Sequence, residues 1–162
     1  MTKSLIIYFS RADENYAVGY ISKGNTEIVA EYLQELTGAD LFKVKPLVPY
    51  AADYKTCIQE AKERIGHAPI KEKLGDLSSY TTLYILSPIY WGTYAPEMET
   101  ALTGLDYTGK TIRIITTHEG SGLANVPQDV ARICKGAIVD KKGLAIVGSK
   151  AKSAKATIAK WL

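Results

Sequence analysis

The sequence predicts an α/β domain: a five-stranded parallel sheet between two layers of helices, in a doubly wound three-layer arrangement. Short apolar runs alternate with segments of helical spacing along the whole chain. The runs are nearly continuous in Val, Ile and Leu, which is typical of strands buried on both faces of a parallel sheet. Five strand–helix units occupy all 162 residues, so we expect a single domain over 1–162.

The first half of the chain contains two of these units. The apolar run SLIIYFS predicts a strand at 4–10. A helix follows, indicated by apolar residues at helical spacing: Ile28, Val29, Tyr32, Leu33 and Leu36. Gly38 is a stop signal for this helix, and ADLFKVK predicts the second strand at 39–45. After a loop, an amphipathic pattern predicts a helix at 54–66, and an irregular stretch follows it.

The second half contains the other three units. Strands are expected at 81–88, 110–117 and 143–149, and helices at 96–105, 125–134 and 151–161. Pro96 suits the first turn of its helix, because proline has no N–H to donate there. Ser149 is a plausible N-cap for the last helix, whose apolar face is formed by Ala151, Ala154, Ile158 and Trp161.

Composition narrows the class of protein. Hydrophobic residues make up 46% of the chain, and no apolar run approaches the roughly 20 residues that span a bilayer, so we expect no membrane association. The start lacks the pattern of a secretory signal, which favours a cytoplasmic location. Cys57 and Cys134 have no metal-like spacing, and two free thiols are favoured over a disulfide.

The net charge of +3 is unevenly distributed. Residues 135–162 contain seven lysines and one acid, Asp140. This segment has no arginine and does not interleave its lysines with aromatic residues, so a solvated helix face is favoured over a nucleic-acid surface.

Ligands of open α/β sheets bind beyond the carboxyl ends of the strands, which directs attention to the loops after strands one, three and four. In the first loop, Ser10 and Thr26 offer hydroxyls, while Gly24 and Asn25 allow a tight turn before the helix. The amino end of that helix suits a phosphate, and Arg11 could add positive charge. The alternative is that Asn25 is an ordinary N-cap and no ligand is bound.

The other two loops offer aromatic and polar groups. SPIYWGT at 87–93 places Tyr90 and Trp91 beside a glycine, which would suit a flat aromatic ligand; alternatively, Trp91 packs back onto the core. TTHEGSG at 116–122 contains His118 and Glu119. A catalytic base and ordinary loop solvation are both open for His118, and the two neighbours are no dyad because adjacent side chains point apart.

Together, YFSR…GNTE, PIYWGT and THEGSG resemble the flavodoxin-like family, short-chain type, over essentially the whole length. The resemblance implies strand order 2-1-3-4-5 and bound FMN. It implies that Ser10, Arg11, Gly24, Asn25 and Thr26 hold the phosphate, that Pro88, Ile89, Tyr90, Trp91 and Gly92 flank one side of the ring, and that Thr117, His118, Glu119 and Gly120 flank the other. The flavin carries the redox chemistry, so no catalytic acid or base is assigned.

The implied function is electron transfer to a redox partner protein or a small quinone-like acceptor. Low-potential carriers of this family are usually acidic, and the +3 charge therefore gives weight to an alternative, an NAD(P)H-dependent quinone reductase. A second alternative is a non-redox module that binds another phosphate ligand. A receiver domain is excluded because strand three ends in Ser87 and not Asp, and a low-molecular-weight phosphatase because Cys-x5-Arg is missing. Monomer and homodimer both stay open.

The phosphate loop of this chain is interrupted. Removing Asp13–Lys23 would join SRA directly to GNT, so this segment is interpreted as an insertion. We expect it to arch out beside the cleft, where its Tyr16 and Tyr20 partly cover the cofactor or shape the acceptor site.

Overall fold

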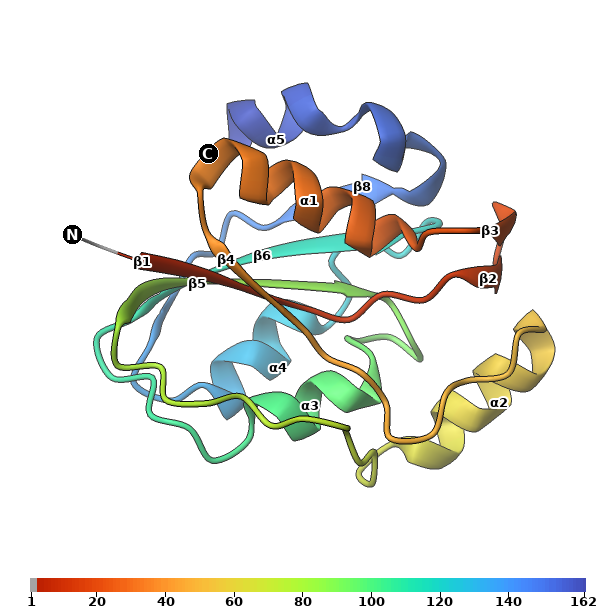
Figure 1. Ribbon diagram of the computed structural model, residues 1–162, viewed down its shortest axis with the longest axis horizontal. Helices are drawn as coiled ribbons and strands as arrows, with labels where there is room; N and C mark the ends of the chain where they lie inside the picture. The colour runs from red at the N-terminus through yellow and green to blue at the C-terminus, as the bar shows by residue number, and fades with distance from the viewer. Residues whose placement is uncertain (1–2) are drawn as a thin grey trace.

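A six-stranded parallel sheet forms the middle of three layers in the computed structural model, which describes residues 3–162 (Figure 1). The strands are β1 (Lys3–Tyr8), β2 (Asp13–Asn15), β3 (Gly19–Ile21), β4 (Asp40–Lys43), β5 (Tyr80–Pro88), β6 (Thr111–His118), β7 (Ile138–Val139) and β8 (Leu144–Val147). The helices are α1 (Asn25–Thr37), α2 (Tyr54–Arg64), α3 (Pro96–Leu102), α4 (Val126–Ile133), the 3₁₀ helix η1 (Gly148–Ser153) and α5 (Lys155–Trp161). Within these residues, no helix is long and apolar enough to cross a membrane.

The sheet order is β4-β1-β5-β6, with both β7 and β8 beside β6. This confirms the expected order 2-1-3-4-5, but the fifth position is divided between two strands. Thr111 and Ile112 of β6 pair with β7, whereas Ile115–His118 pair with β8. The sequence did not predict β7 because two residues are too few to carry a periodic pattern.

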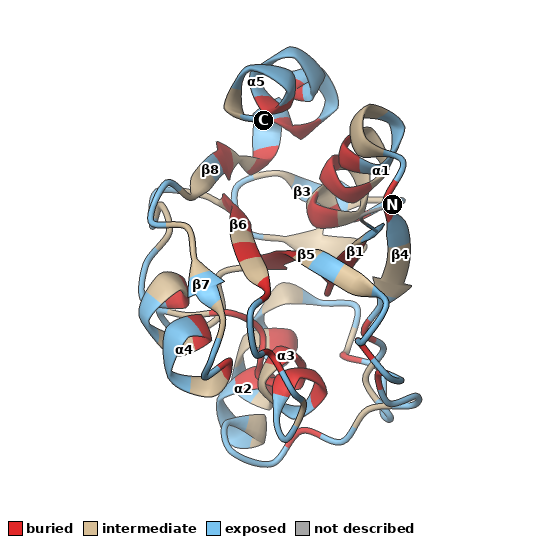
Figure 2. Ribbon diagram, turned by 90° about the vertical axis from the view of Figure 1, so that its left-hand side faces the viewer, coloured by how far each residue is buried: buried red, intermediate tan, exposed pale blue. Residues whose placement is uncertain are grey.

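The continuous apolar runs are explained by burial on both faces of the sheet. Leu5 and Ile7 of β1 pack in the core shared with α2, α3 and α4. Ile6 and Tyr8, which point the other way, pack in the core shared with α1 and α5. Successive strand residues point to opposite faces, so both cores need apolar residues from the same strand. Figure 2 shows the buried residues on both sides of the sheet.

The end of the chain differs from the expected helix. Residues Gly148–Ser153 form the 3₁₀ helix η1, and α5 begins only at Lys155, with Ala154 as its N-cap. The prediction that Ser149 caps the last helix is therefore wrong; Ser149 is exposed. Ala151 and Ala154 are both buried, and their spacing of three residues matches the three residues per turn of a 3₁₀ helix.

The segment interpreted as an insertion has a structure of its own. β2 and β3 pair antiparallel, with Asp13 opposite Ile21 and Asn15 opposite Gly19. This hairpin projects beyond the carboxyl ends of the sheet strands, to the right of the start of α1 in Figure 1.

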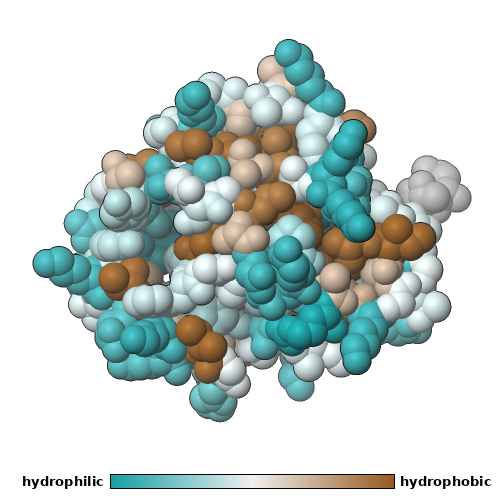
Figure 3. Space-filling view, turned by 180° about the vertical axis from the view of Figure 1, so that it is seen from behind, coloured by the Kyte–Doolittle hydropathy of each residue, from teal (hydrophilic) through white to brown (hydrophobic). Residues whose placement is uncertain are grey.

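The lysine-rich end is exposed, as expected for a solvated face. All seven lysines between 135 and 162 are exposed, and Lys155 pairs with Glu35 at 2.6 Å. On the face seen in Figure 3, hydrophilic side chains project around hydrophobic patches. The two thiols, Cys57 and Cys134, are buried and free, which confirms the favoured alternative.

Candidate functional site

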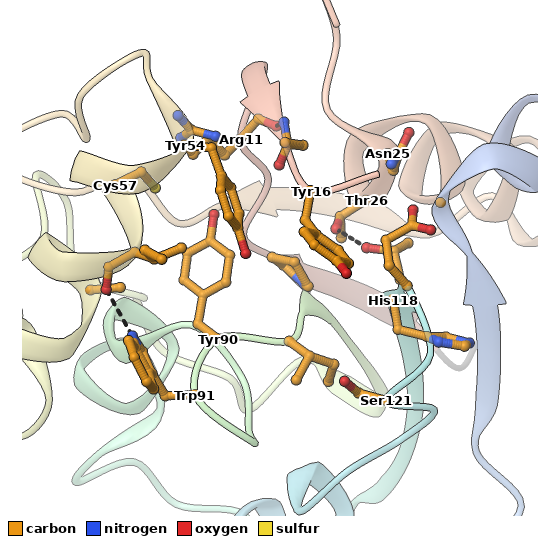
Figure 4. Close-up of a pocket in the computed structure, with 18 residues that line it drawn as sticks. Arg11, Tyr16, Asn25, Thr26, Tyr54, Cys57, Tyr90, Trp91, His118 and Ser121 are labelled. Atoms are coloured by element: carbon orange, nitrogen blue, oxygen red, sulfur yellow. Dashed lines mark hydrogen bonds between the residues drawn. The ribbon is translucent and has the colours of Figure 1, made fainter. Parts of the chain in front are cut away.

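One cavity of about 350 Å³ opens at the carboxyl ends of β1, β5 and β6, where the three loops converge. A volume of that size is within the usual range for small-molecule sites. Eighteen residues line it: Arg11, Asn15, Tyr16, Asn25, Thr26, Tyr54, Cys57, Ile58, Ala61, Pro88, Ile89, Tyr90, Trp91, Thr117, His118, Glu119, Ser121 and Gly148 (Figure 4).

The amino end of α1 faces this cavity. The N-cap of α1 is Gly24, and Asn25 is already the first residue of the helix. The alternative that Asn25 is the N-cap is therefore wrong. Instead, the hydroxyl of Ser10, two residues after β1, accepts a 3.0 Å hydrogen bond from the N–H of Glu27. Ile28 N–H bonds to the carbonyl of Gly24. Since the first four amides of a helix have no partner within it, those of Asn25 and Thr26 are left for a ligand.

Gly24 is required here by close packing. A Cβ on Gly24 would lie 2.0 Å from Ser10 Oγ and 2.8 Å from the carbonyl oxygen of Arg11. The backbone of Gly24 has φ −61° and ψ 148°, which any residue can adopt. The glycine is therefore needed for the close approach of the two ends of the loop.

A buried hydroxyl pair joins the first loop to the third. Thr26 Oγ1 and Thr117 Oγ1 lie 2.8 Å apart, and both residues are buried. This bond places the amino end of α1 beside the end of β6, so the expected convergence of these loops is seen in the structure.

Glu119 points toward the amino end of α1. A Cβ added to Gly148 would lie 2.2 Å from Glu119 Oε1 and 2.5 Å from Asn25 Nδ2, so these two side chains meet at Gly148. Glu119 Oε1 is buried and has no hydrogen-bond partner among residues 3–162. The carboxylate therefore lies at the end of the cavity where the phosphate was expected.

His118 folds back onto its own loop. Its Nδ1 accepts a 2.9 Å hydrogen bond from the N–H of Gly120. Figure 4 shows the ring directed away from the middle of the cavity. This arrangement supports a loop-shaping role over that of a base acting in the cavity.

Arg11 does not point to the amino end of α1. Its guanidinium donates to the carbonyl oxygens of Ala51 and Ala52, at 2.7 and 2.8 Å, and to that of Glu14. The group thus joins the hairpin to the segment before α2. Its Nε is buried without a partner in the part of the chain that the structure describes.

The loop after β5 turns tightly at Trp91 and Gly92, with φ of 53° and 83°. Tyr90 and Thr93 pair across this turn. The indole N–H of Trp91 donates a 2.8 Å hydrogen bond to the carbonyl of Ile58 in α2, and the residue as a whole is 52% exposed. Trp91 therefore lies against α2 at the cavity wall, and not in the core.

Groups from the hairpin and α2 complete the wall. The rings of Tyr16 and Tyr54 are 5.7 Å apart. Burial raises the pKa of Cys57, and raises that of Tyr90 well above its ordinary value. Both groups are therefore neutral near neutral pH. Tyr50 and Tyr94 are buried and do not line the cavity, whereas Tyr54 does.

Ten of the fourteen expected site residues line the cavity: Arg11, Asn25, Thr26, Pro88, Ile89, Tyr90, Trp91, Thr117, His118 and Glu119. Ser10, Gly24, Gly92 and Gly120 belong to the same loops but do not line it. The expectation omitted Asn15, Tyr16, Tyr54, Cys57, Ile58, Ala61, Ser121 and Gly148. Of these, Tyr16 was expected beside the cleft, because it is an aromatic residue in a polar insertion. The α2 residues carry only a helical pattern, which does not indicate a binding site.

Comparison with known proteins adds family evidence. The model of the family described as "Flavodoxin" matches residues 15–162. A crystal structure of a Bacteroides eggerthii protein is similar, with a TM-score of 0.69 and 22% identity over 98% of this chain and 99% of that one. A Lactobacillus acidophilus flavoprotein in complex with FMN has a TM-score of 0.67 and 20% identity, over 99% of both chains. Oxidised Flavodoxin 2 from Bacillus cereus has a TM-score of 0.54 and 15% identity, over 99% and 100%. No curated protein matches the chain.

Proposed function

The chain belongs to the flavodoxin family, and on this premise we propose that it binds FMN in the cavity and transfers electrons through it. The observation that carries the proposal is the amino end of α1. The amides of Asn25 and Thr26, in the first turn of α1, have no partner within the helix, and both residues line the cavity together with Thr117. Such an end is suited to a phosphate group.

In the proposed complex, mainly neutral donors bind the phosphate group of FMN. Gly24, Asn25 and Thr26 supply backbone and side-chain groups, and Ser10 supports the turn by capping Glu27. Arg11, expected here from its position in the chain, is engaged with carbonyl groups of the hairpin and the segment before α2. In our proposal it is not a phosphate ligand.

The loops after β5 and β6 bound the part of the cavity that we propose for the flavin ring. Pro88, Ile89, Tyr90 and Trp91 offer apolar surface on one side, and Gly92 allows their turn. On the other side, the segment from Thr117 to Gly120 offers backbone groups for the polar edge of a ring. On the first side, burial raises the pKa of Tyr90 well above its ordinary value, so this phenol is neutral near neutral pH.

Bound FMN supplies the one- and two-electron redox chemistry, which side chains of this chain cannot perform. The chain's own residues bind and orient the cofactor. The apolar wall excludes water from the ring, and the close packing of Gly24 against Ser10 keeps the phosphate loop in position.

The test is titration of the apo protein with FMN and with riboflavin, which has the same ring but no phosphate. We expect the purified protein to be yellow, with flavin absorption at about 450 nm, and to prefer FMN to riboflavin. A folded protein that binds neither flavin would refute the proposal and favour a module for another phosphate ligand.

A second candidate, a flavoenzyme that passes electrons from NAD(P)H to a quinone-like acceptor, is favoured by two observations. The charge of +3 differs from that of acidic carriers, and the hairpin adds an aromatic wall to the cavity. Steady-state oxidation of NAD(P)H in the presence of a quinone would support the enzyme. No turnover, together with electron exchange with a redox protein, would support the carrier.

A further inference from the structure

Four residues behind the cavity wall form one connected group of aromatic and charged side chains. They are Phe9, Tyr50, Arg64 and Glu97, and we call them the Tyr50 set. The four do not line the cavity, but Tyr90 does, and its ring packs against two of them. We propose that the Tyr50 set positions the ring of Tyr90 at the cavity wall. The inference rests on the proposed function for the identity of the ligand at that wall, a flavin ring.

The ring of Tyr90 is held by two nearly perpendicular contacts. Its centroid lies 5.7 Å from that of Phe9 at an interplanar angle of 77°, and 5.9 Å from that of Tyr50 at 87°. Phe9 and Tyr50 are themselves 6.0 Å apart at 89°. Edge-to-face pairs at such distances are favourable and depend on angle, so a shift of Tyr50 would release one side of Tyr90.

Tyr50 is in turn held at its hydroxyl and at its face. The hydroxyl donates to both carboxylate oxygens of Glu97, at 2.8 and 3.1 Å. Arg64 Nη1 donates to Glu97 Oε2 at 3.2 Å, and the guanidinium carbon of Arg64 lies 3.9 Å from the centre of the Tyr50 ring. One ion pair therefore fixes the Tyr50 ring at two places.

The ion pair is a costly way to stabilise the fold. The side chain of Glu97 is fully buried, and that of Arg64 is 16% exposed. Moving two charges out of water costs so much that apolar side chains of similar volume often give equal or greater stability. A buried pair supplies something that apolar packing lacks, because its hydrogen bonds fix the angles of the groups that they join. This favours a role in orienting Tyr50.

The place of Tyr90 in the chain explains why its ring needs an external support. Tyr90 begins the tight turn through Trp91 and Gly92, and its backbone pairs with that of Thr93. These contacts fix the backbone but leave the side-chain torsions free. Figure 4 shows the Tyr90 side chain among those that line the cavity. The Tyr50 set selects one orientation of this ring before a ligand binds, which lowers the entropic cost of binding.

A second group of the same chemistry lies nearby on α3 and supplies the control. The hydroxyl of Tyr94 donates to Glu99 Oε1 at 2.6 Å, and Arg132 pairs with the same oxygen at 2.6 Å. Tyr94 is buried, like Tyr50. Within residues 3–162, however, the ring contacts of Tyr90 do not include Tyr94. Tyr94→Phe therefore removes the same kind of hydrogen bond without touching the support of Tyr90.

The experiment is fluorescence titration of the apo variants with FMN and with riboflavin. We expect Tyr50→Phe to weaken the binding of both flavins by about threefold to tenfold, the cost of ordering one more side chain on binding. The preference for FMN over riboflavin should stay as in the wild type, because both contain the ring and the Tyr50 set is not at the phosphate end. Tyr94→Phe should leave both affinities unchanged.

A second variant separates positioning from stability. When Arg64→Met and Glu97→Leu are combined, apolar side chains replace the ion pair, so the fold can keep its stability while Tyr50 loses the groups that orient it. Urea denaturation measures the stability, and ¹³C relaxation of the Tyr90 ring in the apo protein measures its motion. We expect faster ring flips than in the wild type, both in this double variant and in Tyr50→Phe, and the same loss of flavin affinity.

The outcomes distinguish this inference from the proposed function. Unchanged flavin affinities in Tyr50→Phe, or a loss confined to FMN, would overturn the inference and leave the proposed function standing. An equal loss in Tyr94→Phe would assign the effect to stability and overturn it as well. If the wild type binds neither flavin, the proposed function fails. The apo measurement then decides the inference by itself, because unchanged motion of the Tyr90 ring in both variants would overturn it.

Discussion

The hydroxyl oxygens of Thr26 and Thr117 lie 2.8 Å apart in the interior, although 91 residues separate them in the chain. One belongs to the first turn of α1 and the other to the end of β6. This bond connects the two loops that we propose to hold opposite ends of the cofactor, so the stability of the fold and the shape of the site depend on the same contact.

Replacing Thr117 tests this connection. Thr117→Val keeps the shape but leaves the hydroxyl of Thr26 without its partner, so we expect a loss of about 1–3 kcal/mol in the free energy of unfolding. Thr117→Ser keeps the hydroxyl and should cost less. Urea denaturation of both variants measures the difference. Equal losses would show that packing of the methyl group, and not the hydrogen bond, is what matters.

The packing of Gly24 against Ser10 gives a second prediction. Gly24→Ala introduces a Cβ 2.0 Å from Ser10 Oγ, so the turn must shift, and we expect FMN affinity to fall by tenfold or more. Gly75→Ala is the control, because a Cβ there would meet nothing within 4 Å. Flavin fluorescence titration compares the two. Unaltered affinity in Gly24→Ala would show that the turn does not position the phosphate.

Arg11 is predicted to hold the hairpin and not the phosphate. In Arg11→Met the carbonyls of Ala51 and Ala52 lose their donor, so backbone amides of 13–21 should exchange hydrogen faster. The preference for FMN over riboflavin should change less than about threefold. Lys160→Met, an exposed charge on α5, controls for net charge. Collapse of the FMN preference in Arg11→Met alone would restore the phosphate role expected from the sequence.

The carboxylate of Glu119 should oppose the phosphate. Its Oε1 lies at Gly148 beside Asn25, where a phosphate bound to α1 would add negative charge. Removing like charge favours binding, so Glu119→Gln should tighten FMN binding severalfold and leave riboflavin binding unchanged. Calorimetric titration with the two flavins measures this. Weaker FMN binding in Glu119→Gln would mean that the carboxylate itself contacts the cofactor.

Stability in alkaline solution should depend on Cys134. Burial raises the pKa of its thiol from 9.0 to about 12. The thiol has a higher pKa in the folded state than in the unfolded state. Its contribution to the free energy of unfolding is therefore complete below pH 9 and is lost as the pH rises from about 9 to 12. The slope from one such group is at most about 1.4 kcal/mol per pH unit. Urea denaturation at several alkaline pH values should give a shallower decline for Cys134→Ala than for the wild type; parallel declines would assign the titration to other groups.

The strands could be predicted because their signal is local. Val, Ile and Leu runs such as LIIYF are buried on both faces, and five of them are separated by helical patterns, so order and class follow. The ends of elements were less well predicted. η1 replaces the start of the last helix because Ala151 and Ala154 are packed by neighbours that the local pattern does not show.

The site was predictable to the extent that loops after parallel strands meet at one edge of the sheet. Asn25, Thr26, Tyr90 and Thr117 were expected at this edge in this way, and they line the cavity. The direction of each side chain was not predictable. Arg11 turned to carbonyls 40 and 41 residues away, and Glu119 turned to the amino end of α1.

The sequence by itself determined the α/β class, the strand order and the three loops that line the cavity, because these depend on periodicity and on the family resemblance. Only the tertiary structure decided that the interrupted phosphate loop folds as a hairpin, that Arg11 joins it to the segment before α2, and that Tyr16 and Tyr54 face one cavity. These contacts connect residues about 40 positions apart, and their energies depend on packing and hydrogen bonds that exist only once the chain has folded.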